Sequence, residues 1–131
     1  MTRNLKLGRV RLGLAAALLV PLAAAVPSAA HHSYAMFDMN KKVALEATVV
    51  RFKWQNPHAF IELDAARGNA RERWSIEMTS PNNLAQEGWK RTSLKPGDKV
   101  TVWVHPLRSG AKGGSYAGVR LPDGSTLGDV S

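Results

Sequence analysis

The feature that most constrains the fold of this chain is an alternation of apolar and polar residues that changes phase part-way along. Apolar residues occupy every second position from Val43 to Val49, and the alternation continues on the opposite parity from Val50 to Trp54. A period of two is typical of a strand with one buried face. A change of phase inside a strand indicates a bulge or sharp coil, where the strand bends between two faces of a barrel. We therefore predict a small β-barrel with a strongly coiled first strand.

Four more strands and one short helix are predicted after Trp54. Ser80-Pro81 is typical of a helix start, because a hydroxyl residue caps the first turn and proline fits the first helical position. The predicted elements are strands at 59–65 and 74–78, a helix from Ser80 to near Gly88, strands at 100–104 and 116–121, and a short tail. Three strands, a helix and two strands is the order of the OB-fold. The expected fold class is therefore all-β with one short helix, a small five-stranded OB-like barrel; the alternative is another small antiparallel barrel or sandwich.

Residues 1–30 have the order of a secretory signal peptide. Residues 1–11 are basic, residues 12–26 form an apolar run, and small residues follow up to Ala30. The apolar run is shorter than the roughly 20 residues that span a bilayer, so we favour a signal peptide over an uncleaved membrane anchor. Cleavage after Ala30 fits best, and cleavage after Ala25 or Ala29 is the alternative. We expect an exported, periplasmic protein with a signal peptide at 1–30 and a single domain at 31–131.

The charge and the cysteine count limit the function classes. The chain has 131 residues and a formal charge of +8, but four basic residues and no acidic ones lie in residues 1–30, which leaves 14 basic against 10 acidic residues in the expected mature chain. An exported protein does not meet the genome, so we expect no nucleic-acid partner, and no membrane contact after cleavage. The absence of cysteine excludes disulfides and thiolate metal ligands. The oligomeric state is left open.

The four histidines are the best candidates for chemistry, and two of them, His31 and His32, directly follow the expected cleavage site. After cleavage at Ala30, the amine and the ring of His31 form a chelating pair, which a second imidazole completes as a three-nitrogen set. Copper favours nitrogen ligands in tetragonal arrangements and heads the divalent affinity order. This arrangement resembles the histidine brace of lytic polysaccharide monooxygenases and of some periplasmic copper carriers. If cleavage follows Ala29, histidine stands third, which is another amino-terminal copper chelate.

His58 is the preferred second imidazole, in the segment Trp54-Gln55-Asn56-Pro57-His58-Ala59. On the following strand His58 shares parity with polar positions, so we expect it to point away from the core. The candidate metal ligands are therefore His31, His58 and His32, with His105 a weaker choice. The thioethers of Met36 and Met39 suit Cu(I), although packing is the commoner role of methionine.

Other patterns favour structural interpretations. Trp54 and Trp74 fall on apolar parities and are expected to pack in the core or at a barrel end, whereas Trp103 is the better surface candidate. The basic residues that alternate with apolar ones, among them Arg71, indicate a solvated strand face. No serine lies in a nucleophile elbow and no HExxH motif occurs, so we expect no enzyme, with a copper-dependent oxidative enzyme as the remote alternative.

The chain resembles an uncharacterised family of small exported proteobacterial proteins, a domain of unknown function. The matching motifs are His31-His32-Ser33, Phe37-Asp38, the Trp-x-Asn-Pro-His-Ala segment at 54–59, Ser80-Pro81-Asn82, Gly88-Trp89, and Leu94 to Asp98. The resemblance implies an exported, barrel-like domain whose mature chain starts at the paired histidines, and it implies no activity. Together with the histidines it suggests a small periplasmic binding protein that holds copper as a carrier or buffer. The alternative is a metal-free structural or protein-interaction module, whose partner would be another protein.

Overall fold

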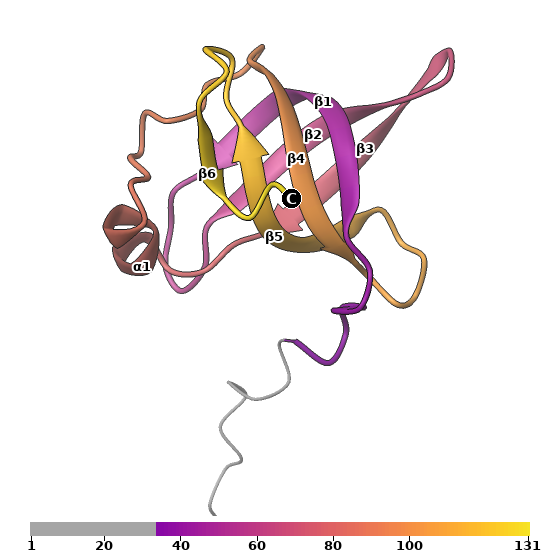
Figure 1. Cartoon of the computed structure of the whole chain (residues 1–131), viewed down its shortest axis with the longest axis horizontal. Helices are drawn as coiled ribbons and strands as arrows, with labels where there is room; N and C mark the ends of the chain where they lie inside the picture. Colours follow the sequence, from indigo (N-terminus) through magenta and orange to yellow (C-terminus); the bar gives the residue numbers. More distant parts are fainter. Residues whose placement is uncertain (1–33) are drawn as a thin grey trace, which may run out of the picture.

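The computed structural model describes residues 34–131, and its main feature is one continuous six-stranded sheet that curves into a barrel (Figure 1). The elements in chain order are β1 (Val43–Lys53), β2 (Phe60–Arg67), β3 (Ala70–Glu77), α1 (Pro81–Gln86), β4 (Lys99–Pro106), β5 (Gly113–Arg120) and β6 (Thr126–Gly128). The predicted signal peptide, His31 and His32 lie outside the described residues. No helix between residues 34 and 131 is long and apolar enough to cross a membrane.

The strand order β3-β2-β1-β4-β5-β6 is closed by an additional pairing of β3 with β5. All neighbouring strands are antiparallel except this closing pair, which is parallel. The result is a closed five-stranded barrel with one extra strand, which confirms the predicted OB-like class with one short helix. Figure 1 shows α1 at the end of the barrel away from the β2–β3 turn.

The phase change of the first strand is a bulge. The register between β1 and β2 shifts between Val49 and Arg51, at the position where the apolar parity changes. Val49 is buried with 1% exposure in the core, whereas Phe52 and Trp54, on the other parity, pack against the core from a partly exposed position. The extra residue lets one strand follow the curvature of the barrel and pair with both β2 and β4.

The barrel interior is filled by the apolar residues of alternate strand positions. Ile61, Leu63, Ile76, Val102 and Val104 have no solvent exposure. Removal of this apolar surface from water is the main contribution to the stability of the fold. The helix starts as predicted: Ser80 is its cap, its hydroxyl accepts a hydrogen bond from the amide of Asn83, and Pro81 is the first helical residue.

The strands differ from the sequence prediction in three places. β3 begins at Ala70, four residues before Trp74. β5 begins at Gly113, not near Tyr116, and the tail contains a sixth strand. Gly113 and Gly114 have no side chains, so they leave no trace in the apolar pattern. They are needed there because a Cβ on Gly114 would lie 2.8 Å from the carbonyl oxygen of His105. β6 has only three residues, too few to produce a period of two.

Candidate functional site

His58 lies two residues before β2, and of the three preferred metal ligands it is the one within the described residues. Its side chain is 39% exposed and lies outside the apolar core, as its parity predicted. Its Nδ1 lies 2.6 Å from Oε1 of Glu77, at the end of β3. The antiparallel register of β2 and β3 pairs Phe60 with Glu77, and this register brings the two side chains to the same barrel end.

The contact with Glu77 orients the imidazole of His58. A carboxylate only accepts hydrogen bonds, so the Nδ1–H group of His58 donates a hydrogen bond to Glu77. In the neutral ring the lone pair then resides on Nε2. Histidines that bind metals usually donate their other ring nitrogen to a carboxylate or a carbonyl, which fixes the ring and raises its basicity as a ligand. When the ring of His58 is neutral, this contact therefore selects the tautomer that a metal ligand requires.

Closure of the barrel places His105 near this pair. Glu77 of β3 is paired with Ser115 of β5, and Ser115 is paired with His105 of β4. The Nδ1 of His105 lies 2.7 Å from the carbonyl oxygen of Lys41, to which it donates, so its Nε2 is also the ring nitrogen with the lone pair. In their neutral forms, His58 and His105 are thus held in the same tautomer, one by the carboxylate of Glu77 and the other by the carbonyl oxygen of Lys41.

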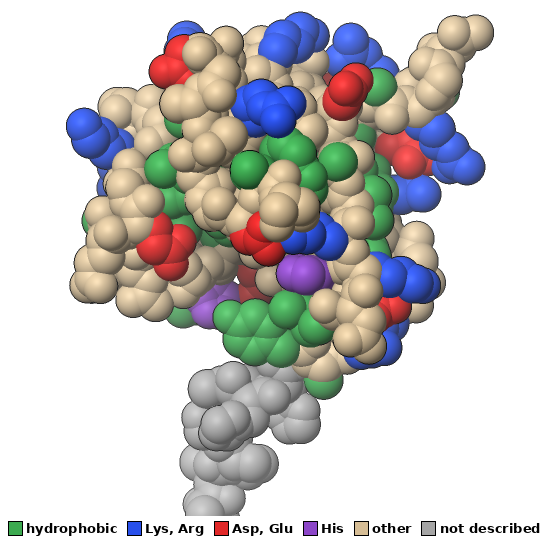
Figure 2. Space-filling view, viewed as in Figure 1, with side chains coloured by type: hydrophobic (Ala, Val, Ile, Leu, Met, Phe, Trp, Pro, Cys, Tyr) green, Lys and Arg blue, Asp and Glu red, His purple; other side chains and the backbone are tan. Residues whose placement is uncertain are grey.

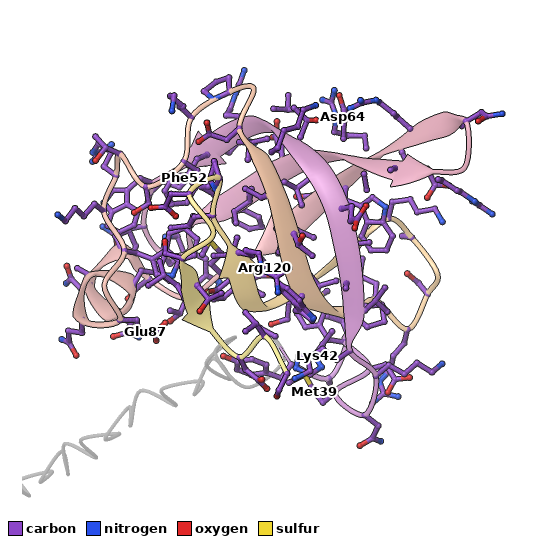
Figure 3. All side chains as sticks on the ribbon, turned by 45° about the horizontal axis from the view of Figure 1, so that its top comes forward. Met39, Lys42, Phe52, Asp64, Glu87 and Arg120 are labelled. Atoms are coloured by element: carbon purple, nitrogen blue, oxygen red, sulfur yellow. The ribbon has the colours of Figure 1, made fainter. Side chains whose placement is uncertain are left out.

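These side chains line a pocket of about 440 Å³ at one end of the barrel. Figure 2 shows the two described histidines in purple on either side of a hollow, and Figure 3 labels Met39 and Glu87, which also line it. The full lining is Tyr34, Phe37, Met39, His58, Glu77, Met78, Thr79, Glu87, His105, Ser115, Tyr116 and Ala117. Two carboxylates and two imidazoles are among the lining residues, and no lysine or arginine lines the pocket. In a chain of formal charge +8, such a pocket favours a cation.

The described residues do not form a complete metal site by themselves. Among residues 34–131, no group of three histidine or acidic side chains is arranged to hold a metal ion. His31 and His32 lie outside the described residues, but Tyr34, three positions after His31, lines the pocket. Met39 lines the pocket too, whereas Met36, which is 50% exposed, does not.

The tryptophans follow the packing interpretation. Trp74 is buried, and Trp54 packs against the core. Trp89 is also buried and contacts the rings of Phe52 and Tyr116, at centroid distances of 5.6 and 5.5 Å. Trp103 is half-buried on the outer face, where the guanidinium of Arg120 lies 5.4 Å from its ring centroid. One face of the Trp103 ring is therefore partly covered by the side chain of Arg120.

Sequence reasoning missed Glu77 and Glu87 as members of the pocket. The signal for Glu77 was present, because a hairpin centred on Gly68 pairs Phe60 with Glu77 and sets His58 beside it. No comparable signal exists for Glu87, which reaches the pocket from the end of α1. Its place depends on where the helix packs on the barrel.

Comparison with known proteins gives a family but no activity. No curated protein and no solved structure matches the chain. A family model matches residues 19–116, which include β1 to β4 in full, the first half of β5 and both described histidines. The match agrees with the resemblance to an uncharacterised family. The chain therefore belongs to the family of unknown function DUF6152.

Proposed function

We propose that this protein is a small exported binding protein that holds copper at its mature amino terminus and acts as a periplasmic carrier or buffer, with no enzymatic activity. The observation that carries the proposal is the carboxylate-lined pocket, in which His58 is oriented by Glu77 and to which Tyr34 also belongs. An extended chain spans at most about 3.3–3.6 Å per residue, so His31 is tethered within roughly 11 Å of Tyr34.

The proposed ligand set consists of nitrogen atoms. Cleavage after Ala30 exposes the amine of His31 beside its own imidazole, and Nε2 of His58 supplies the third nitrogen. His32 is the substitute for His58. Glu77 holds the His58 ring, and the negative charges of Glu77 and Glu87 favour a divalent cation over a neutral ligand. Copper is the expected metal because it binds nitrogen sets of this kind most tightly among the divalent first-row ions.

The experiment is a Cu(II) titration of protein secreted with its own signal sequence, after mass spectrometry has established the mature terminus. We expect a dissociation constant tighter than about 1 μM. His31→Ala and His58→Ala should each weaken binding strongly. Glu77→Gln should weaken it roughly 10–100-fold, because loss of a carboxylate behind a ligating histidine has that effect. An extension of four residues before His31 should abolish binding at this site, because the free amine is then no longer on His31. A single added residue is not a suitable test, because it places His32 third, which is itself a copper chelate.

His105→Ala is the matched control, since it removes an imidazole from the same pocket without touching the proposed ligands. It should leave the affinity unchanged. The copper proposal is wrong if the wild-type protein shows no submicromolar binding, or if His31→Ala and His58→Ala bind as tightly as the wild type.

The second candidate is a metal-free protein-interaction module. It is favoured by large apolar side chains on the surface of the segment that leads into β1: Tyr34 is 62% exposed, Met36 50%, Met39 44% and Val43 39%. These four side chains lie on one short segment of the chain, and exposed apolar patches mark interaction surfaces. A protein that binds no copper but loses a partner on Tyr34→Ser and Met36→Ser substitution would support this second function.

A further inference from the structure

A second groove of about 440 Å³ lies on the outer face of the sheet, apart from the histidine pocket. Its lining comes from all five barrel strands, mostly from outward-facing positions but including the core residues Ala47 and Val100, and from the turn after β5. None of the lining residues is shared with the histidine pocket. Figure 3 labels two of the lining residues, Asp64 on β2 and Arg120 on β5. The alternation of basic and apolar residues around Arg71 predicts a solvated strand face, but the contacts of Arg71 indicate more.

Two cations converge on one hydroxyl group in this groove. Oγ1 of Thr48 accepts hydrogen bonds from Nη1 of Arg71 at 3.1 Å and from Nζ of Lys99 at 2.6 Å. The two charged nitrogens therefore lie within about 6 Å of each other. Arg71 reaches Thr48 from β3, two strands away, whereas Lys99 is the direct cross-strand partner of Thr48 on β4. Like charges this close repel each other, and a neutral hydroxyl does not neutralise them.

Neither cation forms an ion pair with a carboxylate among residues 34–131, whereas Arg73, on the same strand as Arg71, does. Arg73 is bound to Asp64 at 2.6 Å, and this hydrogen bond lowers the pKa of Asp64. Asp64 lines the groove, but its carboxylate is thus already engaged. The other carboxylate of the groove is Glu46, two residues from Thr48 on the same face of β1, and it forms no ion pair with Arg71 or Lys99.

We propose that this groove binds an oxyanion of the phosphate type, held by Arg71, Lys99 and Thr48. The hydroxyl of Thr48 has two lone pairs and one proton, and both lone pairs face the two cations. Its O–H is therefore left to donate to a ligand. The guanidinium and the ammonium each keep N–H donors beyond the one given to Thr48, and two such cations within about 6 Å of each other form a donor set that suits a tetrahedral oxyanion.

The groove is larger than the anion alone. A volume of about 440 Å³ lies within the range of small-molecule clefts, so the phosphate is expected to be the head of a larger group. Arg120, stacked on Trp103, stands at the β5 side of the groove and adds a third positive charge there. Free phosphate monoesters and lipid phosphate headgroups share this chemistry, and the experiment below separates them.

The test follows backbone amide shifts of the full chain by NMR during a titration with inorganic phosphate, at ionic strength held constant with chloride. We expect saturable shifts at Thr48, Arg71 and Lys99, with a dissociation constant of about 1 mM or tighter. The double variant Arg71→Gln/Lys99→Gln should weaken binding at least about tenfold. The matched control is Lys90→Gln/Arg91→Gln, which removes the same charge from two exposed residues outside the groove. It should bind phosphate like the wild type.

Shifts that do not saturate, or an equal loss of affinity in both double variants, would overturn the proposal, because either result means general charge attraction. Vesicles of phosphatidylcholine with and without phosphatidic acid identify the source of the ligand. Selective binding to phosphatidic acid that is lost in Arg71→Gln/Lys99→Gln supports a lipid headgroup. Saturable binding of inorganic phosphate without vesicle binding supports a soluble phosphate compound. A change in copper affinity is not expected in either variant, so this test is independent of the copper proposal.

Discussion

At the scale of single residues, Tyr116 connects the barrel to its extra strand. Its hydroxyl donates a hydrogen bond to the carbonyl oxygen of Leu127 at 3.0 Å, and its ring packs edge-on against Trp89. Burial raises the pKa of Tyr116 above its ordinary value of 10.0, because the phenolate would lose its hydration. One side chain thus holds β6 in place and makes the contact sensitive to alkaline pH.

We predict that Tyr116→Phe lowers the free energy of unfolding at neutral pH by about 1 kcal/mol, the typical net value of one hydrogen bond. The folded state binds the phenolic proton more tightly than the unfolded chain does. The contribution of Tyr116 is therefore complete below pH 10 and declines as the pH rises above it. Denaturant unfolding at neutral and alkaline pH should show a smaller alkaline loss in Tyr116→Phe than in the wild type.

The control for that measurement is Tyr34→Phe, since Tyr34 is 62% exposed. This variant should unfold like the wild type at both pH values. An alkaline loss of the same size in Tyr116→Phe and the wild type would show that another group is responsible.

At the scale of elements, close backbone contact determines the pairing of β5 with β6. Gly118 is paired with Gly128, and a Cβ on Gly118 would lie 2.3 Å from the carbonyl oxygen of Asp129. A real Cβ does not come this close to backbone, so the β6 strand must move if Gly118 is replaced. Gly128 also has a φ of 74°, in the region that favours glycine.

We predict that Gly118→Ala displaces β6 and costs about 1–3 kcal/mol, the range of overpacked sites. Amide hydrogen exchange should become faster in Thr126–Gly128, while β1 to β4 keep their protection. Gly68→Ala is the comparison, because its Cβ would meet no atom within 4 Å and only its φ of 55° is unfavourable. Retention of β6 protection in Gly118→Ala would contradict the prediction.

Some elements were predicted from the sequence and others were missed. The coiled first strand, the helix cap at Ser80 and the three strands with clear alternation are confirmed, because each depends on local pattern. The start of β5 and the whole of β6 were missed, because glycine carries no apolar signal and three residues carry no period. Both depend on contacts with distant segments, such as that of Gly114 with His105.

At the scale of the whole molecule, the parallel pairing of β3 with β5 closes the barrel. Ile76 lies at this seam, opposite Gly114, with no solvent exposure. We predict that Ile76→Ala costs about 2–5 kcal/mol, the range for truncation of a buried aliphatic side chain. Denaturant unfolding measures the loss. Ser75→Ala, an exposed neighbour on the same strand, should change stability by less than about 0.5 kcal/mol. Equal effects of the two substitutions would contradict a packed seam.

The sequence by itself determined the features that depend on local pattern. Alternation, caps and turns indicated an all-β barrel with one helix, and the scarcity of histidine directed attention to His58. The tertiary structure alone decided which side chains meet. Barrel closure brings Glu77 and His105 to one pocket. The curvature of the sheet lets Arg71 and Lys99 donate hydrogen bonds to the same hydroxyl, that of Thr48. The physical reason is that these contacts join residues of different strands, and their register depends on packing and closure of the whole barrel, which no local period encodes.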